Sequence, residues 1–547
     1  MQLRPTNEYT TEVMDHHGLV AAVCRDLKIA EKINQRIGSK DPRRVVQPGV
    51  ACVAMILNGL GFTNRRLYLT PQFFESKSMS ALFEEDIKAS DLNEHSLGKA
   101  ADEIAKYGAS RLYAEVVFEI ALEQGLLGVK NHLDTTSFTL HGSYNNDEPS
   151  HCVEVTHGFS KDHRPDLKQV MMSLVMNGPA NIPLWMEPQN GNSSDKTSFH
   201  QTIERVNAFK NQLKACDDFI WIADSALYSA EKLLACPHVM WLSRVPETIK
   251  ACSQLISIKS EDIIWTQGEN GYQWAEFCSL YGGIKQRWLL VYSEQAFKRE
   301  QKTLEKNIAK EKKEALKKCQ QLKAKVFGCV HDAEKEIQRI QKKIKYHLIH
   351  YAIEPIEKYD SRGRPNPLTP KVTVGYQILD ELMENKAAIT EALRKKGRFV
   401  LGTNQLDETQ LPSMAILKEY KSQQNVEGGF RFLKDPWFML DSFFVKTREK
   451  IEALMMCMAL CLLVYNFAQY RVRKTLSESD ETVPNQLGKP IKNPTVKWLF
   501  QCMEGIAIIK NDMMACITNL SNLRQQIVRL FGETACKVYG LTELNSS

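Results

Sequence analysis

The chain lacks most features that mark secreted, disulfide-bonded or zinc-binding proteins. Its opening residues, MQLRPTNEYTTEV, contain no apolar run, so we expect no signal peptide. The fourteen cysteines are scattered and include no C-x-x-C pair, only a C-x3-C at Cys457 and Cys461. In a large chain without a signal peptide, such cysteines are expected to be reduced thiols. We therefore expect a cytoplasmic protein.

Long hydrophobic runs are also scarce. The longest uncharged one, residues 453–470, is at the lower limit of length for a membrane span and contains Asn466 and Gln469. It stands alone and follows a charged helical pattern. We interpret it as a buried core helix and expect no membrane partner, with a membrane span as the alternative.

The chain has little excess of charge of either sign, because its net charge is only +6. Its distribution is uneven: from Lys298 to Lys325 there are eleven Lys or Arg against four Asp or Glu. Sparse apolar residues near helical spacing continue to residue 350, and VFGCVHD interrupts them. This pattern predicts a basic helical hairpin over 298–350, while a solvated helix or coiled-coil arm is the alternative.

What is present indicates several domains, because 547 residues exceed one hydrophobic core. Helical spacing and short apolar runs predict an α/β protein with a mixed sheet. We expect a helical N-terminal domain at 1–125, a first part of the sheet domain at 126–246, an insertion at 247–412, a pair of helices at 413–475 and a helical C-terminal region at 476–547. Within the insertion, YDSRGRPNPLTP predicts a linker at 359–370, and a helix is expected at 377–396.

Three carboxylates occupy positions that suit metal chemistry. Asp134 lies in a strand-like run, and Asp224 ends the apolar strand FIWIAD. Glu427 shares a helix face with Arg431 and Lys434 at spacing i, i+4 and i+7. Together they could hold two divalent cations about 4 Å apart, as in phosphoryl transfer. The alternatives are turn-capping aspartates and a surface salt-bridge ladder.

These residues and their surroundings carry a family resemblance. The order Asp, Asp, Glu resembles the DDE transposases of bacterial insertion sequences, whose catalytic domain is ribonuclease H-like. LDTTSF, GFSKDHRPDLKQ, IADSALYS and VEGGFRFLKDP together resemble one branch of that superfamily across about 130–470. The branch is marked by the signature Y-x2-R-x3-E-x6-K. Tyr420, Glu427 and Lys434 stand at this spacing, but Gln423 occupies the position of the arginine.

The resemblance implies roles for single residues. Asp134, Asp224 and Glu427 would be the catalytic, metal-binding triad for two Mg²⁺ or Mn²⁺ ions, which hard carboxylate oxygens suit. Tyr420 and Lys434 would contact DNA phosphate near the cleavage site.

The arginine of the signature is the point of departure. Gln423 could donate a hydrogen bond to phosphate but lacks the charge and fork of an arginine. Arg431, one turn beyond the glutamate, could supply the missing cation. The family also carries a large insertion between the second aspartate and the glutamate, expected to be β-rich, whereas the middle of this one looks helical.

Two further segments could contact DNA. Arg362 and Arg364 form the Arg-Gly-Arg-Pro core of an AT-hook, which fits a narrow minor groove, although such linkers are common. Lys161 and Arg164 are grouped shortly after the first predicted strand, where a solvated turn is the alternative to phosphate contact.

The resemblance implies a transposase that cuts DNA at terminal inverted repeats and joins the freed 3′-hydroxyl to target DNA. Its partners would be double-stranded DNA and a second copy of the chain in a synaptic complex, near the bacterial nucleoid. The N-terminal domain is expected to recognise the element's ends. Because of Gln423, the alternative is a catalytically impaired, transposase-like DNA-binding protein. A coiled-coil scaffold built on 298–350 would leave the triad unexplained.

Overall fold

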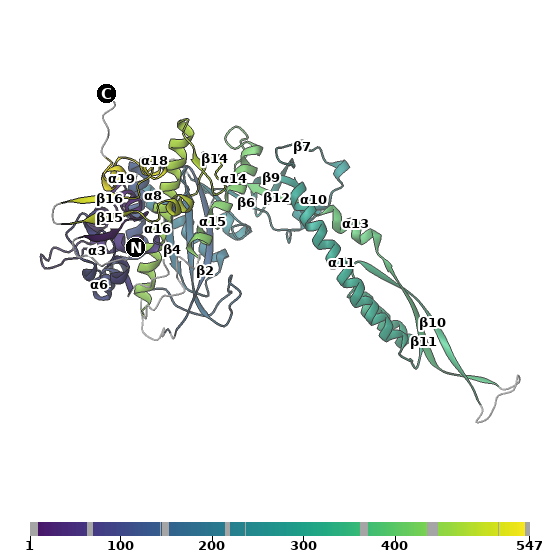
Figure 1. Cartoon of the computed structure of the whole chain (residues 1–547). Helices are drawn as coiled ribbons and strands as arrows, with labels where there is room; N and C mark the ends of the chain where they lie inside the picture. The colour runs from purple at the N-terminus through teal and green to yellow at the C-terminus, as the bar shows by residue number, and fades with distance from the viewer. Residues whose placement is uncertain are drawn as a thin grey trace. The chain divides into compact units, whose positions relative to one another are not determined.

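A computed structural model describes residues 9–62, 69–142, 144, 152–213, 219–235, 237–360, 370–434, 447–511 and 514–541. The chain divides into two compact units. Unit 1 comprises residues 1–242 and 418–547, and unit 2 comprises residues 243–417. The α/β class expected from the sequence is confirmed, because each unit combines helices with strands (Figure 1).

Unit 1 begins with helices that enclose an apolar core. Pro48 occupies the first turn of α3, where its missing N–H costs no hydrogen bond, and the side chain of Asn93 caps α6 by accepting from Ser96 N at 3.1 Å. These elements are α1 (His17–Asp26), α2 (Ile29–Ile37), α3 (Pro48–Gly59), α4 (Thr70–Phe74), α5 (Met79–Leu82), η2 (Ala89–Asp91), α6 (Glu94–Tyr107) and α7 (Ala109–Glu123).

The sheet of unit 1 is mixed. Its strands lie in the order β4-β3-β2-β5-β6. The first three in sequence form an antiparallel meander, and β5 pairs with β2 in parallel. The parallel step needs a crossover, which α8 supplies. The elements are β2 (Lys130–Leu140), β3 (Lys168–Asn177), β4 (Ile182–Gln189), α8 (Asp195–Leu213), β5 (Ile220–Ala223), α9 (Ala230–Ala235) and β6 (Met240–Arg244), where β6 reaches the boundary of unit 2.

The chain returns to this sheet through three helices: α14 (Ser413–Ser422), which begins in unit 2 and ends in unit 1, α15 (Gln424–Leu433) and α16 (Arg448–Glu478). By length and composition α16 could cross a membrane, but 78% of its most apolar window is buried inside the protein. It packs against α3, α6, α7 and β4. The run at 453–470 is therefore a core helix, as expected.

The C-terminal part of unit 1 is not purely helical, which corrects the expectation for 476–547. The strand β1 (Thr10–Val13) pairs with β15, so the two ends of the chain share a sheet. Strands this short carry little sequence signal. The elements are β13 (Val483–Pro484), β14 (Pro490–Ile491), α17 (Val496–Cys502), β15 (Ala507–Lys510), β16 (Ala515–Thr518), α18 (Asn522–Leu530) and α19 (Glu533–Val538).

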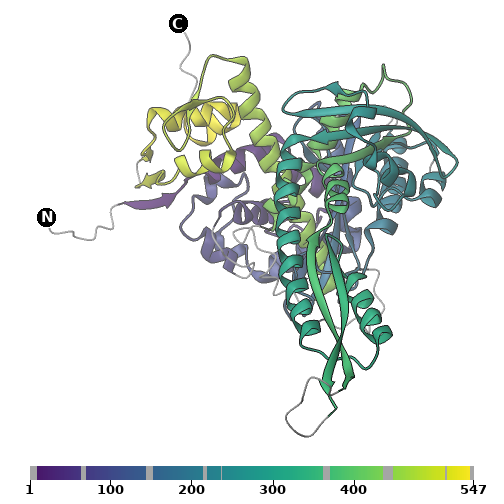
Figure 2. The ribbon, with the colours of Figure 1, turned by 90° about the vertical axis from the view of Figure 1, so that its right-hand side faces the viewer.

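Unit 2 contains antiparallel strands in the order β12-β9-β8-β7 and an arm built of two helices and a hairpin. The arm has a core of its own, in which Cys319, Ile337, Ile349 and Ile378 pack together. Figure 2 shows α11 and α12 beside the hairpin β10–β11. The elements are α10 (Lys250–Ser257), η3 (Ser260–Asp262), β7 (Thr266–Gln267), β8 (Tyr272–Tyr281), β9 (Ile284–Ser293), α11 (Glu294–Lys323), α12 (Val330–Gln341), β10 (His347–Tyr359), β11 (Lys371–Glu384), α13 (Lys386–Arg394) and β12 (Arg398–Thr403).

One expectation about unit 2 is wrong, and another falls largely outside the described residues. Most of the linker expected at 359–370 is not described; the strands on either side of it, β10 and β11, pair from His347–Glu384 to Tyr359–Lys371, so it connects two strands of one hairpin. The helix expected at 377–396 is a strand up to Glu384, and only α13 is helical. The basic helical segment expected at 298–350 corresponds to α11 and α12, with its last residues in β10.

Candidate metal and DNA site

Two aspartates lie at the same level on neighbouring parallel strands. The register pairs Lys130 with Ile220 and His132 with Ile222. Two residues further along each strand, this register places Asp134 level with Asp224, which directly follows β5. Adjacent strands are about 4.8 Å apart, and residues at one level point to the same face. We call Asp134 and Asp224 the aspartate pair.

Each aspartate is half-buried and bonded to nearby backbone. Asp134 Oδ1 accepts from Thr135 N at 2.7 Å, and Asp224 Oδ1 accepts from Ala226 N at 2.8 Å. The second contact is the turn-capping role that the sequence left open. Two half-buried carboxylates at one level of a sheet are a donor arrangement that suits a divalent cation.

Glu427 comes from α15, which packs on β2 and β3. A Cβ built on Gly429 would lie 3.2 Å from Leu462 and 3.8 Å from Leu174. Leu174 is the register partner of Asp134, so its side chain points to the same face of the sheet. The absence of a side chain at Gly429 therefore lets α15 lie on the face that carries Asp134, with Glu427 exposed at its first turn.

The three carboxylates do not form a closed cluster. In the described part of the chain, no three His, Cys, Asp or Glu side chains are close enough together to hold a metal ion. The register, continued past the end of β5, thus puts Asp134 and Asp224 at one level of the sheet, but the two do not form a metal-holding group with Glu427 among the described residues. The donor chemistry nevertheless fits Mg²⁺ or Mn²⁺, because these ions take carboxylate oxygens and complete their coordination with water and phosphate.

Contacts that the sequence did not suggest fix α14 against β2. Lys130 Nζ lies 2.6 Å from Glu419 Oε1, and His132 Nε2 lies 3.1 Å from Ser422 Oγ. Burial lowers the pKa of His132 to about 4, so its imidazole is neutral at pH 7. Because Ser422 Oγ donates to Glu419 O at 2.7 Å, His132 Nε2 is the donor to Ser422. Only the placement of Lys130 and His132 on the strand face that also carries Asp134, at every second position, could have hinted at these partners.

Tyr420 and Gln423 lie where α14 passes into α15. Tyr420 is half-buried. Gln423 is 8% exposed and its carbonyl accepts from Val426 N at 3.0 Å, which starts α15. Little of the Gln423 side chain is therefore open to DNA in this conformation.

The basic residues expected at the site have different surroundings. Lys434 ends α15, where Nζ lies 2.7 Å from Asp162 Oδ1 and over the ring of Phe138. Arg431 is exposed to solvent. Lys161 Nζ donates to the carbonyl of Thr135 at 2.6 Å, so a cation lies one residue from Asp134.

Arg164 fits the solvated-turn reading better than phosphate contact. It forms a local, exposed ion pair with Asp166 at 2.8 Å, and this guanidinium holds the pKa of the Asp166 carboxyl down at about 2. Arg362 and Arg364 lie outside the described residues.

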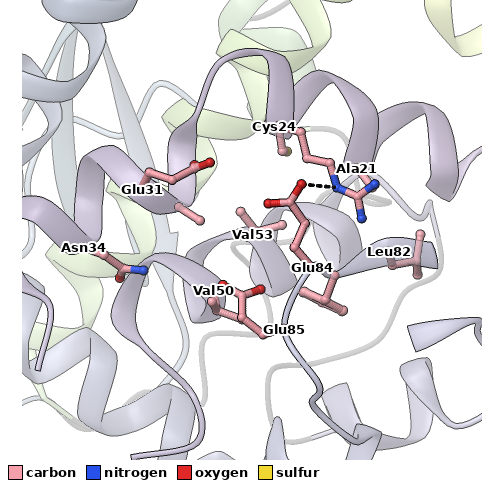
Figure 3. A pocket seen from close by; sticks show the side chains of 12 residues that line it. Ala21, Cys24, Glu31, Asn34, Val50, Val53, Leu82, Glu84 and Glu85 are labelled. Carbon is pink, nitrogen blue, oxygen red and sulfur yellow. Dashed lines mark ion pairs between the residues drawn. The ribbon is translucent and has the colours of Figure 1, made fainter. Parts of the chain in front are cut away.

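A separate pocket lies among the N-terminal helices (Figure 3). Its cavity of about 70 Å³ is lined by Cys24 and Val53 and by three carboxylates, Glu31, Glu84 and Glu85, the second of which lies 3.6 Å from Arg25. With three carboxylates against the single cation Arg25, this lining is unfavourable for a phosphate group.

Comparison with known proteins gives a family match for more than half of the chain. Residues 133–464, more than half of the chain, match the family described as transposase DDE domain, and residues 9–118 match a domain of unknown function, DUF4277. Among solved structures, a cryo-EM piggyBac transposase synaptic complex with hairpin DNA is similar, with 8% identity and a TM-score of 0.33 over 86% of this chain and 79% of that one. No curated protein is significantly similar. On the family match, the chain belongs to the DDE transposases.

Proposed function

We propose that this chain is the transposase of an insertion-sequence element and cuts DNA at terminal inverted repeats. The observation that supports the proposal is the β2–β5 register, which, continued two residues beyond the pair His132–Ile222, sets Asp134 level with Asp224. The strand order β4-β3-β2-β5-β6, with an antiparallel meander and a parallel fourth strand, supports a ribonuclease H-like catalytic domain.

Asp134, Asp224 and Glu427 would hold two divalent cations, Mg²⁺ or Mn²⁺. Bound there, the ions would activate the attacking oxygen and stabilise the leaving oxygen in an in-line displacement at phosphorus. Because Glu427 is exposed on the first turn of α15 and forms no three-carboxylate group with the pair in the described part of the chain, we infer that its side chain turns toward the aspartate pair when DNA and metal bind.

The chain's own cations would orient the substrate. Lys161 lies one residue from Asp134, and Lys434 could exchange Asp162 for a phosphate oxygen of the cleaved strand. Hydrolysis adds water to the phosphorus and releases a 3′-hydroxyl at the element's end. In strand transfer, that hydroxyl attacks a target phosphodiester and displaces a second 3′-hydroxyl.

The reaction needs both ends of the element, so we propose a homodimer that binds two DNA ends near the bacterial nucleoid. The DUF4277 region, residues 9–118, is our candidate for recognising the ends.

The test is nicking of a duplex that carries the inverted repeats flanking the gene. We expect nicks at the repeat ends with Mg²⁺ or Mn²⁺, none with a chelator, and none with Asp134→Ala, Asp224→Ala or Glu427→Ala. Cleavage that survives all three substitutions would refute the site assignment.

Gln423 favours a second candidate, a catalytically impaired DNA-binding protein. If the wild-type chain binds the ends without nicking them, Gln423→Arg tests this reading by restoring the cation of the signature. Nicking gained by Gln423→Arg would support impairment, and nicking by the wild-type chain would exclude it.

A further inference from the structure

The exposed side of α11 carries a row of cations. Arg299, Lys302, Lys306, Lys310, Lys313 and Lys317 are all exposed and recur every three or four residues. At 3.6 residues per turn, they fall within about 80° of the helix circumference and extend over about 27 Å. We call these six residues the cationic stripe.

The stripe lies opposite the buried face of the same helix. Leu304, Ala315, Cys319 and Leu322 are buried, and their mean direction is about 180° from that of the stripe. The last three belong to the core that α11 shares with α12 and the hairpin β10–β11 (Figure 2). Packing of the arm therefore fixes the stripe toward solvent.

The charges of the stripe are not neutralised within the described chain. None of its six side chains forms an ion pair with a described residue, whereas Lys298 on the same helix pairs with Glu294 at 2.6 Å. Glu314 borders the stripe, and no carboxylate lies inside it. Three i, i+4 neighbours are like-charged: Lys302 with Lys306, Lys306 with Lys310, and Lys313 with Lys317. Such pairs destabilise an isolated helix. A helix face that contacts only solvent is more stable when positively and negatively charged side chains alternate along it.

We propose that the cationic stripe binds the phosphate backbone of double-stranded DNA. This inference rests on the proposed function, which supplies DNA as the substrate, and it adds a DNA contact in unit 2. A length of about 27 Å spans roughly eight base pairs at 3.4 Å each. Flexible lysines contact phosphates without reading sequence, so the contact is expected to be insensitive to base sequence.

The apolar face of α11 makes a membrane surface a poorer partner. A helix that lies on a membrane buries an apolar face in the lipid beside its basic residues. In α11 that face is already covered by α12 and the hairpin. A regular line of charges opposite a covered face suits a rigid polyanion.

The test compares two variants of the full chain with equal change in charge. The stripe variant carries Lys306→Gln, Lys310→Gln, Lys313→Gln and Lys317→Gln. The control variant carries Lys312→Gln, Lys335→Gln, Lys342→Gln and Lys343→Gln, four exposed lysines of the same unit outside the stripe. Glutamine keeps the helix propensity of lysine, and circular dichroism checks the fold.

The readout is binding of a 60-base-pair duplex without inverted repeats, titrated at several salt concentrations. Each lost phosphate contact should reduce the slope of log K against log salt by about 0.9, so the stripe variant should lose about 3.6 and bind at least roughly tenfold more weakly. The control variant should keep the wild-type slope to within about 1.

The inference would be overturned if the slope of log K against log salt were the same for the stripe variant and the wild type. It would also be overturned if the wild type bound phosphatidylglycerol vesicles and did not bind the duplex. Asp134→Asn separates this failure from failure of the proposed function. It should abolish nicking and leave the salt slope unchanged. If the stripe variant binds normally while Asp134→Asn loses nicking, the stripe is not a DNA contact but the catalytic proposal stands.

Discussion

The aspartate pair of unit 1 and the cationic stripe of unit 2 place charge in opposite physical settings. Asp134 and Asp224 are half-buried, and the register of two strands fixes their level. The cations of α11 are exposed, and only the helical repeat aligns them. Charge that is partly buried and fixed acts through geometry, so one substitution should abolish function. Exposed charge acts through number, so each substitution should have a small and additive effect.

The largest expected effect separates cleavage from binding at the aspartate pair. Asp134→Asn or Asp224→Asn should lower the nicking rate by about 10³-fold or more, because a lost metal removes several kcal/mol of transition-state stabilisation. The affinity for DNA should not fall. Rate and binding are measured on one labelled duplex, and Asp166→Asn, which removes an exposed carboxylate paired with Arg164, is the matched control. A rate within tenfold of the wild type would contradict the account.

A second effect is a dependence of stability on pH, which comes from His132 in the contact between α14 and β2. The folded pKa of His132 is about 4 and its unfolded value is 6.5, so below pH 6.5 the unfolded state takes up the proton first. Stability should therefore fall as pH drops from 6.5 toward 4, and this histidine should contribute about 2 kcal/mol of the loss between pH 7 and 5.

His132→Gln should remove that part of the acid sensitivity. Urea unfolding at the two pH values measures it, with His95→Gln, at an exposed position on α6, as the control. An unchanged difference between pH 7 and 5 in His132→Gln would rule out this contribution.

A third effect is a loss of stability when the packing of α15 on the sheet is disturbed. Gly429→Val would press against Leu462 and Leu174 and should destabilise unit 1 by about 1–3 kcal/mol while slowing nicking. Gly428, with nothing within 4 Å of a built Cβ, is the matched position, and Gly428→Ala should stabilise the helix by up to about 1 kcal/mol. Thermal unfolding distinguishes them, and equal shifts for both would show that α15 does not pack as described.

The smallest effect should come from the stripe. Lys306→Gln alone should reduce the salt slope by about 0.9, and Lys306→Gln with Lys313→Gln by about 1.8. Sequence-independent binding measured at several salt concentrations tests the additivity. A single substitution that abolished binding would mean that the stripe acts through geometry, like the aspartate pair.

Part of this picture could be predicted from local patterns. The apolar run FIWIAD predicts β5 and places Asp224 at its end, and the uncharged run at 453–470 predicts the core helix α16. Family motifs single out Asp134. The register that sets Asp134 level with Asp224 is a pairing between segments about ninety residues apart, and no local pattern encodes it.

Elsewhere tertiary pairing overrode the local signal. Ile378 and Leu382 are spaced for a helix face, yet the pairing of β11 with β10 draws them into a strand over the core of the arm. The Pro-rich stretch at 359–370 indicates a break in regular structure, but its composition does not reveal that the segments on either side of it pair as β10 and β11. Likewise β1 meets β15 only because the folded chain returns there.

The most direct test of the central claim is to change the metal preference of the reaction by replacing Asp134 with cysteine. The claim is that this carboxylate and Asp224 hold the catalytic ions. A thiolate is a softer ligand than a carboxylate and disfavours Mg²⁺ more than Mn²⁺. Nicking of inverted-repeat DNA by Asp134→Cys should therefore be lost in Mg²⁺ and partly restored in Mn²⁺, while Asp134→Ala stays inactive in both. Undiminished nicking by Asp134→Cys in Mg²⁺, or equal activity of Asp134→Cys and Asp134→Ala in Mn²⁺, would contradict the account.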